Sequence, residues 1–309
     1  LLLKKKKKIN FDIKSNLEKT IFKIDPLNFK KNIKSNAKLK LSGTYALNKF
    51  TNINEFSYLS NDSKITLNNL FLDEDNKIIK FEELYLDYFD IENKKNKLII
   101  KKKQNNNHYS LKGKKFNANS FITNLLKSKN DNKFRRFKND INLDINLSEV
   151  FLDEKNFVND LTGKVLIIDD KIDKNNISAF FKDNKKLNFT IDNINNEKIT
   201  TLFSSKAKPL VNRYKFIKGF EGSDEGYLDF YSSKKNGISN SKLIIDNFKV
   251  KEIPALAKLL ALASLQGIAD LLTGEGIRFS DFEMNFTKKN KLMTIQELYA
   301  IGPAISILI

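Results

Sequence analysis

Strict alternation of apolar and polar residues dominates residues 9–250 and constrains the fold more than any other feature. The clearest example is the segment 141–147, which reads INLDINL. Successive side chains of a β-strand point to opposite faces, so this pattern predicts strands with one apolar and one polar face. Breaks rich in Asn, Asp, Lys and Gly, such as KKNG at 234–237, predict hairpin turns. At about ten residues per strand and turn, the spacing predicts a meander of roughly twenty antiparallel strands.

One segment departs from this alternation. Residues 254–272 read PALAKLLALASLQGIADLL, with a proline suited to a first helical turn and a glycine soon after the end. Lys258, Gln266 and Asp270 fall on one row at multiples of four, and a charge at mid-membrane costs about 2.5 to 3.5 kcal/mol. The pattern therefore predicts an amphipathic helix docked on the apolar face of the sheet. A shorter helical patch is predicted at 120–126.

The composition excludes several kinds of chemistry. The chain has no Cys, which rules out disulfides, thiolate catalysis and Cys-ligated metals. Its single histidine, His108, follows a run of Asn and is expected to be a surface loop residue. One imidazole cannot build a multi-histidine metal site, and neither a Gly-x-Ser-x-Gly elbow nor a phosphate-binding glycine loop occurs. We therefore expect no catalytic residues, no metal, no cofactor and no enzymatic activity.

The strong positive charge comes almost entirely from Lys. The chain carries 55 Lys+Arg against 37 Asp+Glu, a net charge of +18, and only four of the basic residues are Arg. A nucleic-acid interface more often uses Arg and gathers its basic residues with aromatics on one surface, whereas Lys is scattered here through the whole chain. The charge therefore indicates a solvated sheet face, and nucleic-acid binding is the weakest of the functional alternatives.

A large sheet with one apolar face must cover that face. It can curl into a sandwich or solenoid with a sealed core, or it can form a gutter whose apolar lining is covered by lipid acyl chains. Alternation favours neither, because both need the same pattern. The candidate lining residues are Ile141, Leu143, Ile145, Leu147, Leu187, Phe189, Ile191, Phe282, Met284 and Phe286.

A resemblance in the last third of the chain favours the gutter. The segments that carry it are FIKGFEG at 216–222, GYLDF at 226–230, LIIDNFKV at 243–250, the predicted helix at 254–272, GEGIRF at 274–279 and AIGPA at 300–304. In order and spacing, residues 200–309 resemble the C-terminal region of the AsmA-like superfamily, in its branch of large YhdP-type envelope proteins. One departure is SDEG at 223–226, where that family usually has two adjacent glycines before the strand.

The resemblance implies both a fold and a function. The implied fold is mainly β: a long twisted antiparallel β-groove, an open gutter of roughly twenty strands, with one amphipathic helix near 254–272. It implies a repetitive β-groove region at 1–199 and an AsmA-like C-terminal module at 200–309. The chain opens with Leu1 rather than Met and ends inside an apolar run, so we expect a fragment of a longer protein.

The implied function is non-enzymatic lipid handling in the periplasm of Gram-negative bacteria. Family members are anchored in the inner membrane by an N-terminal helix that this chain lacks, and they are implicated in moving phospholipid toward the outer membrane. The expected partners are phospholipid, the inner membrane through that anchor, and an outer-membrane partner. The alternative from another class is a structural or assembly protein of the envelope whose β core is closed.

Overall fold

The computed structural model shows a mainly β chain, as predicted, with about 70% of the chain in strands and 6% in helices. It divides into two compact units, Leu1–Asp173 and Lys174–Ile309. The strands of each unit form an open sheet. The residues that the structure describes are 8–47, 49–103, 107–127, 137–214, 220–222, 226–251, 276–290 and 292–308. The division into 1–199 and 200–309 stays a prediction, and the predicted helix at 254–272 lies outside the described residues.

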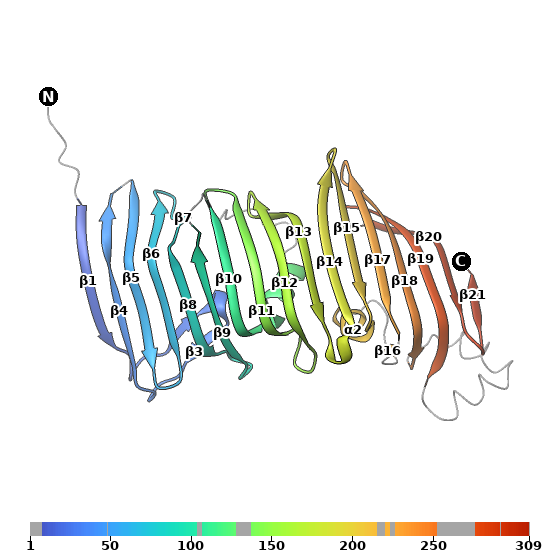
Figure 1. Cartoon of the computed structure of the whole chain (residues 1–309), viewed down its shortest axis with the longest axis horizontal. Coiled ribbons are helices and arrows are strands. Elements are labelled where there is room, and N and C mark those ends of the chain that lie inside the picture. The colour runs from blue at the N-terminus through green and yellow to red at the C-terminus, as the bar shows by residue number, and fades with distance from the viewer. Residues whose placement is uncertain are drawn as a thin grey trace. The chain divides into compact units, whose positions relative to one another are not determined.

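The first unit is built around a sheet with the strand order β1-β4-β5-β6-β8-β9-β10-β11-β12 (Figure 1). Short β7 adds to β6, and β2 pairs only with β3 among the described strands. The strands are β1 (Lys8–Asn16), β2 (Phe22–Ile24), β3 (Phe29–Lys31), β4 (Ala37–Ala46), β5 (Phe50–Ser60), β6 (Lys64–Asp73), β7 (Ile78–Lys80), β8 (Glu83–Phe89), β9 (Lys95–Lys102), β10 (His108–Asn117), β11 (Ile141–Phe151) and β12 (Phe157–Ile168). Its helical segments are the 3₁₀ turn η1 (Asp25–Leu27) and α1 (Asn119–Lys127).

The second unit has the strand order β13-β14-β15-β17-β18-β19-β20-β21, with every neighbouring pair antiparallel. Short β16 also pairs with β18. The elements are β13 (Lys171–Phe180), which begins in the first unit, the 3₁₀ turn η2 (Lys182–Asn184), β14 (Lys186–Ile194), β15 (Glu197–Ser204), α2 (Lys208–Tyr214), β16 (Phe220–Gly222), β17 (Leu228–Lys235), β18 (Ile238–Val250), β19 (Ile277–Lys289), β20 (Leu292–Ile301) and β21 (Ser306–Leu308).

The turn predicted at 234–237 is present, although Lys234 and Lys235 belong to β17, and a similar turn joins β14 to β15. Asn236 and Gly237 have φ of 49° and 78° and join β17 to β18, while Asn195 and Asn196, at 52° and 61°, join β14 to β15. Two successive residues at positive φ match the right-handed twist of the flanking strands, which is why Asn and Gly are preferred there. The short connections let consecutive strands pair antiparallel.

One strand pair in the first unit is parallel, so the sheet is mixed. β10 runs parallel to β11, with Leu111 opposite Ile145. Parallel neighbours need a crossover rather than a tight turn. Part of that crossover is α1, where the sequence predicted a short helical patch, and Phe137 then forms a parallel bridge with Ile78 before β11 begins.

The segment with β2, η1 and β3 covers part of the apolar face of the first sheet. Phe22 stacks on Tyr58 with ring centroids 5.4 Å apart, and Phe29 meets the edges of Tyr58 and Tyr88 at 5.2 and 5.5 Å. The Tyr88 hydroxyl donates a hydrogen bond to the Leu27 carbonyl at 2.8 Å. Aromatic pairs of this kind contribute about 0.5 to 1.5 kcal/mol beyond the area they bury. This segment therefore seals the part of the face beneath it.

Lys31 fixes the covering segment from inside. Its side chain is 4% exposed, and its ammonium donates hydrogen bonds to the carbonyls of Leu17, Thr20 and Asn32 at 2.5, 2.9 and 2.8 Å. Lys31→Met would remove the ammonium donor from these carbonyls, of which, among the described residues, only that of Leu17 has a second donor, the Thr20 N–H, so we expect the free energy of unfolding to fall by about 1 to 3 kcal/mol. Denaturant titration followed by circular dichroism measures the loss. Lys30→Met, at the exposed neighbouring position, is the matched control, and an equal loss in both variants would contradict the assignment.

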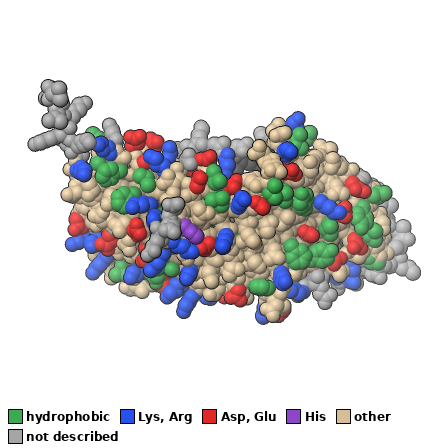
Figure 2. Space-filling view, turned by 45° about the horizontal axis from the view of Figure 1, so that its top comes forward, with side chains coloured by type: hydrophobic (Ala, Val, Ile, Leu, Met, Phe, Trp, Pro, Cys, Tyr) green, Lys and Arg blue, Asp and Glu red, His purple; other side chains and the backbone are tan. Residues whose placement is uncertain are grey.

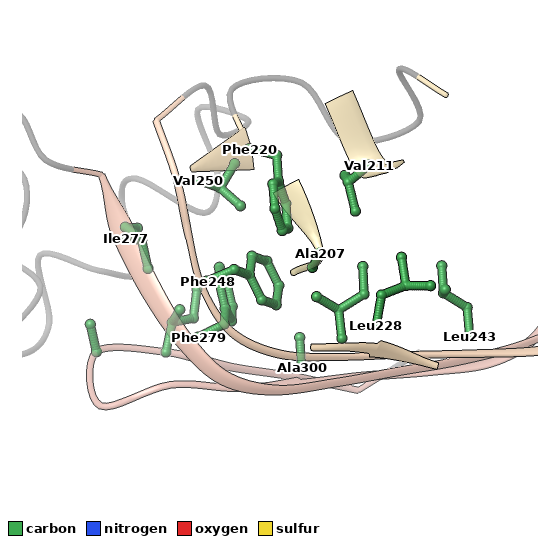
Figure 3. Packing of buried hydrophobic residues seen from close by; sticks show 13 residues of the cluster. Ala207, Val211, Phe220, Leu228, Leu243, Phe248, Val250, Ile277, Phe279 and Ala300 are labelled. Carbon is green, nitrogen blue, oxygen red and sulfur yellow. The ribbon is translucent and has the colours of Figure 1, made fainter. Parts of the chain in front are cut away.

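The second unit has a comparable cover over its sheet. Figure 3 shows Val211 and Phe220 on one side of the cluster and Leu228 and Leu243 of the sheet on the other. Phe220 stacks on Phe248 with centroids 5.0 Å apart. α2 and the segment that includes β16 therefore bury one part of the apolar face.

Candidate functional site

Hydrogen-bond register arranges the apolar side chains into rows that cross the strands. Residues directly opposite one another in paired strands lie on the same face, so successive pairings define a continuous row. In the first unit one such row contains only apolar residues, and we call it the first open row. It consists of Ile13, Leu41, Phe56, Leu67, Leu84, Ile100, Leu111, Ile145 and Gly163.

The first open row is more accessible to solvent than the row beside it, whose central members are buried. Ile13 is exposed, and the other members of the open row are half-buried. A second row lies two residues away on each strand, toward the same edge of the sheet, and we call it the first sealed row. Its members are Ser15, Leu39, Tyr58, Ile65, Leu86, Leu98, Gly113, Leu147 and Leu161. Tyr58 and Ile65 are each 1% exposed, because the β2–β3 segment packs over this part of the face.

The second unit repeats the arrangement. Its second open row consists of Ile177, Phe189, Leu202, Phe230, Leu243, Met284 and Leu298. All of them are half-buried except Leu243, which is buried. The adjoining second sealed row consists of Ala179, Leu187, Ser204, Leu228, Ile245, Phe282 and Ala300. Each unit thus pairs a covered apolar row with one that remains partly accessible.

The predicted lining residues all lie on these apolar faces, at different depths. Ile145 belongs to the first open row, and Phe189 and Met284 belong to the second. The sealed rows contain Leu147, Leu187 and Phe282. The remaining four lie in rows on the far side of the open rows: Ile141, Leu143, Ile191 and Phe286.

Sequence reasoning missed most members of the open rows. Leu41, Leu84 and Leu111 occupy the same row as Ile145, yet none of them was predicted as a lining residue, and some strands that contribute to the row alternate only weakly. β9, for example, has apolar residues on both faces, Ile99 and Ile100. Only the register shows which residues of different strands are neighbours.

The opposite face is polar and carries the ion pairs between strands. Lys40 contacts Glu55 at 2.6 Å, Lys101 contacts Glu83 at 2.9 Å, and Lys242 contacts Glu283 at 2.7 Å. On the face drawn in Figure 2, basic and acidic side chains are intermixed rather than gathered by sign. Pairs this exposed contribute about 0 to 1 kcal/mol each.

His108 belongs to this polar face and not to a surface loop as expected. It is the first residue of β10, it is half-buried, and its Nε2 lies 2.9 Å from a carboxylate oxygen of Asp144. The Lys103 ammonium, which also binds this carboxylate, and then His108 hold the pKa of Asp144 below its usual value. A catalytic triad would need a hydroxyl or thiol nucleophile on the other imidazole nitrogen, and the structure shows no such hydrogen bond within the described part of the chain. The His108–Asp144 contact is a polar contact between neighbouring strands.

Within the described ranges, no group of three or more His, Asp or Glu side chains is arranged to hold a metal ion. None of the helices described is both long and apolar enough to cross a bilayer.

The apolar face of each unit therefore contains a mostly buried row beside a mostly half-buried one, and ion pairs between strands lie on the opposite, polar face. Comparison of the chain with family models, with curated proteins and with solved structures finds no match. Membership of the AsmA-like superfamily stays a prediction from the sequence resemblance.

Proposed function

We propose that this chain binds lipid acyl chains along its open rows and handles lipid without covalent chemistry. The observation that carries the proposal is the continuity of those rows: paired strand after paired strand places an apolar side chain opposite the last, and nearly all remain half-buried. A soluble protein rarely leaves a continuous apolar strip accessible unless it contacts something apolar.

An acyl chain suits the open rows better than a polar ligand does. Neighbouring strands lie about 4.8 Å apart, so a chain that follows a row meets a new apolar side chain at each strand. Removing each methylene from water contributes about 0.8 kcal/mol. The row contains no donor or acceptor side chain, which suits a ligand segment that forms no hydrogen bonds.

The sequence resemblance supplies the cellular setting of the proposal. In it, the chain is a segment of a periplasmic protein that carries phospholipid between the inner and outer membranes and so supports outer-membrane lipid homeostasis. The full-length protein is attached to the inner membrane through an N-terminal anchor, and an outer-membrane partner receives the lipid. The open rows support only the binding of phospholipid, and the other partners come from the sequence resemblance.

Photo-crosslinking tests the proposal at two adjacent positions. Leu143 lies on the apolar face in the row next to that of Ile145, half-buried between Tyr109 and Val165, whereas Asn142 is exposed beside His108 on the polar face. The purified chain, with benzoyl-phenylalanine at either position, is irradiated after incubation with phosphatidylethanolamine and phosphatidylglycerol vesicles. We expect lipid adducts by mass spectrometry at residue 143 and almost none at residue 142. Equal capture at both positions would contradict the proposal.

A second candidate function is an assembly role in the envelope. It is favoured by the exposed apolar side chains of Ile9 and Ile13 on β1, which pairs with β4 alone among the described strands of its unit. An unpaired strand edge of this kind can recruit a partner strand. Lipid extraction separates the two functions, because a purified chain that carries no phospholipid after vesicle incubation would favour assembly.

A further inference from the structure

Beyond the second open row, the part of this face on β15, β17 and β18 changes from apolar to polar in two steps, although Ile191 and Phe286 continue the first of these rows on the neighbouring strands. The first step is a row that contains three hydroxyl residues, Thr200, Ser232 and Ser241, paired in that order across β15, β17 and β18. Ser241 is 9% exposed and donates a hydrogen bond to the Ser232 hydroxyl at 2.8 Å. We call these three residues the hydroxyl row. It lies two positions along each strand from the second open row, so both are on one face.

The second step is a row of ammonium groups. Lys198 pairs with Lys234, which pairs with Ser239 on β18. Ser239 in turn pairs with Lys288 on β19, so all three lysines lie in one row. We call Lys198, Lys234 and Lys288 the lysine rim. Lys198 lies two residues from Thr200 on β15, Lys234 lies two residues from Ser232 on β17, and Lys288 lies two residues from Phe286 on β19. Residues two apart on a strand share a face, so the lysine rim is also on the apolar face. Lys234 and Lys288 are exposed.

The order of chemistry across this face is therefore apolar, hydroxyl, ammonium. With a rise of about 3.3 Å per residue, successive rows are about 7 Å apart, and the lysine rim lies about 13 Å from the second open row. A diacyl phospholipid presents the same order: acyl chains, then ester and glycerol oxygens, then phosphate. Hydroxyl groups can donate to ester oxygens, and Lys is a common point-charge partner of phosphate.

The first unit does not repeat this order. The row at the corresponding place beside the first open row is mostly apolar, although it includes Lys102. Its other members include Phe11, Ile53, Leu70, Tyr109, Leu143 and Val165. The polar gradient is thus a property of the second unit rather than of a sheet edge in general.

We propose that the hydroxyl row and the lysine rim bind the glycerol ester and phosphate of an anionic phospholipid whose acyl chains lie along the second open row. This inference rests on the proposed function, because it needs acyl chains on that row. The charge complementarity selects an anionic headgroup over a zwitterionic one, whose own cation would lie against the ammonium groups.

The chain offers a matched control on the same two strands. Lys235 and Lys289 follow Lys234 and Lys288 by one residue, and both pair with Ile238 on the opposite face. The full chain is incubated with vesicles of equal phosphatidylglycerol and phosphatidylcholine, then repurified, and its bound lipids are quantified by mass spectrometry. We expect wild type to enrich phosphatidylglycerol, and K234E/K288E to lower the phosphatidylglycerol-to-phosphatidylcholine ratio about three- to tenfold with total lipid retained. K235E/K289E should keep the wild-type ratio.

The outcomes separate the inference from the proposed function. If wild type carries no lipid of either kind, the proposed function fails and the inference fails with it. If all three proteins carry lipid at one common ratio, acyl binding stands and the headgroup assignment is overturned. If K235E/K289E lowers the ratio as much as K234E/K288E does, net charge and not the lysine rim is responsible, which also overturns the inference.

Discussion

Ile145→Asp is expected to reduce lipid binding by the purified chain by about a hundredfold. Ile145 lies near the end of the first open row, opposite Leu111 on β10 and Gly163 on β12. A carboxylate there would face the acyl chain that the proposal places on this row. A charge in a hydrocarbon environment costs about 2.5 to 3.5 kcal/mol, which corresponds to roughly that loss in affinity. Bound lipid per folded protein, measured by extraction and mass spectrometry, is the readout.

Asn146→Asp is the matched control for this variant. Asn146 is the next residue of β11, it is exposed, and it lies on the polar face opposite Lys112 and Thr162. It introduces the same charge without touching the row, so lipid binding should stay at the wild-type level. Because Ile145→Asp could also weaken folding, circular dichroism gives the folded fraction, and Ile145→Gln provides an uncharged polar variant. Full lipid binding by folded Ile145→Asp would remove the basis of the proposed function.

Ile245→Ala is expected to cost about 2 to 5 kcal/mol of unfolding free energy. Ile245 is 0% exposed and lies in the second sealed row between Leu228 and Phe282. Its truncation would remove buried methyl groups from the cluster that includes Val211 and Phe220 above the sheet. The cost should be large because close-packed neighbours relax only in part around a cavity.

Ile244→Ala provides the comparison at the adjacent position. Ile244 is half-buried on the polar face, opposite Asp229 and Glu283, so its truncation should cost about 1 kcal/mol. Denaturant titrations of both variants, followed by circular dichroism because the chain has no Trp, give the two values. Equal losses would show that the two faces of β18 do not differ in cover, which would contradict the sealed row.

Local pattern was sufficient to predict the strands and their faces. In the segments 141–147 of β11, 187–191 of β14 and 282–286 of β19 the apolar residues alternate strictly, and the structure places them on one face, as the period of two requires. Turn chemistry was equally readable, since Asn236 and Gly237 occupy the positive-φ positions of the β17–β18 turn.

Partner choice and register were not readable from the same pattern. Alternation specifies the face of a residue but not the strand it pairs with, so the parallel pairing of β10 with β11 could not be foreseen. The cover over Tyr58 and Tyr88 was missed for a related reason, because β2 and β3 are three residues each and too short to show a period. The sealed and open rows arise from these long-range contacts.

The lysine rim shows how far composition can mislead. Lys234 and Lys235 are adjacent in the sequence, where the pattern predicted a hairpin turn, and the surplus of Lys as a whole was assigned to the solvated face. In a strand, adjacent residues point to opposite faces, so Lys234 lies with the apolar residues of β17 and Lys235 lies away from them. A net charge counts both alike, whereas the register separates them.

Because the open rows run from strand to strand, the two dimensions of the apolar strip have separate origins. Its reach depends on how many strands are paired, and each additional hairpin lengthens it by about 10 Å, two strand spacings. Its breadth depends on strand length and on which segments fold back over the face, as β2–β3 and α2 do. Duplication or loss of a hairpin would therefore change the distance that such a strip spans while leaving its cross-section, and the ligand it accepts, unaltered.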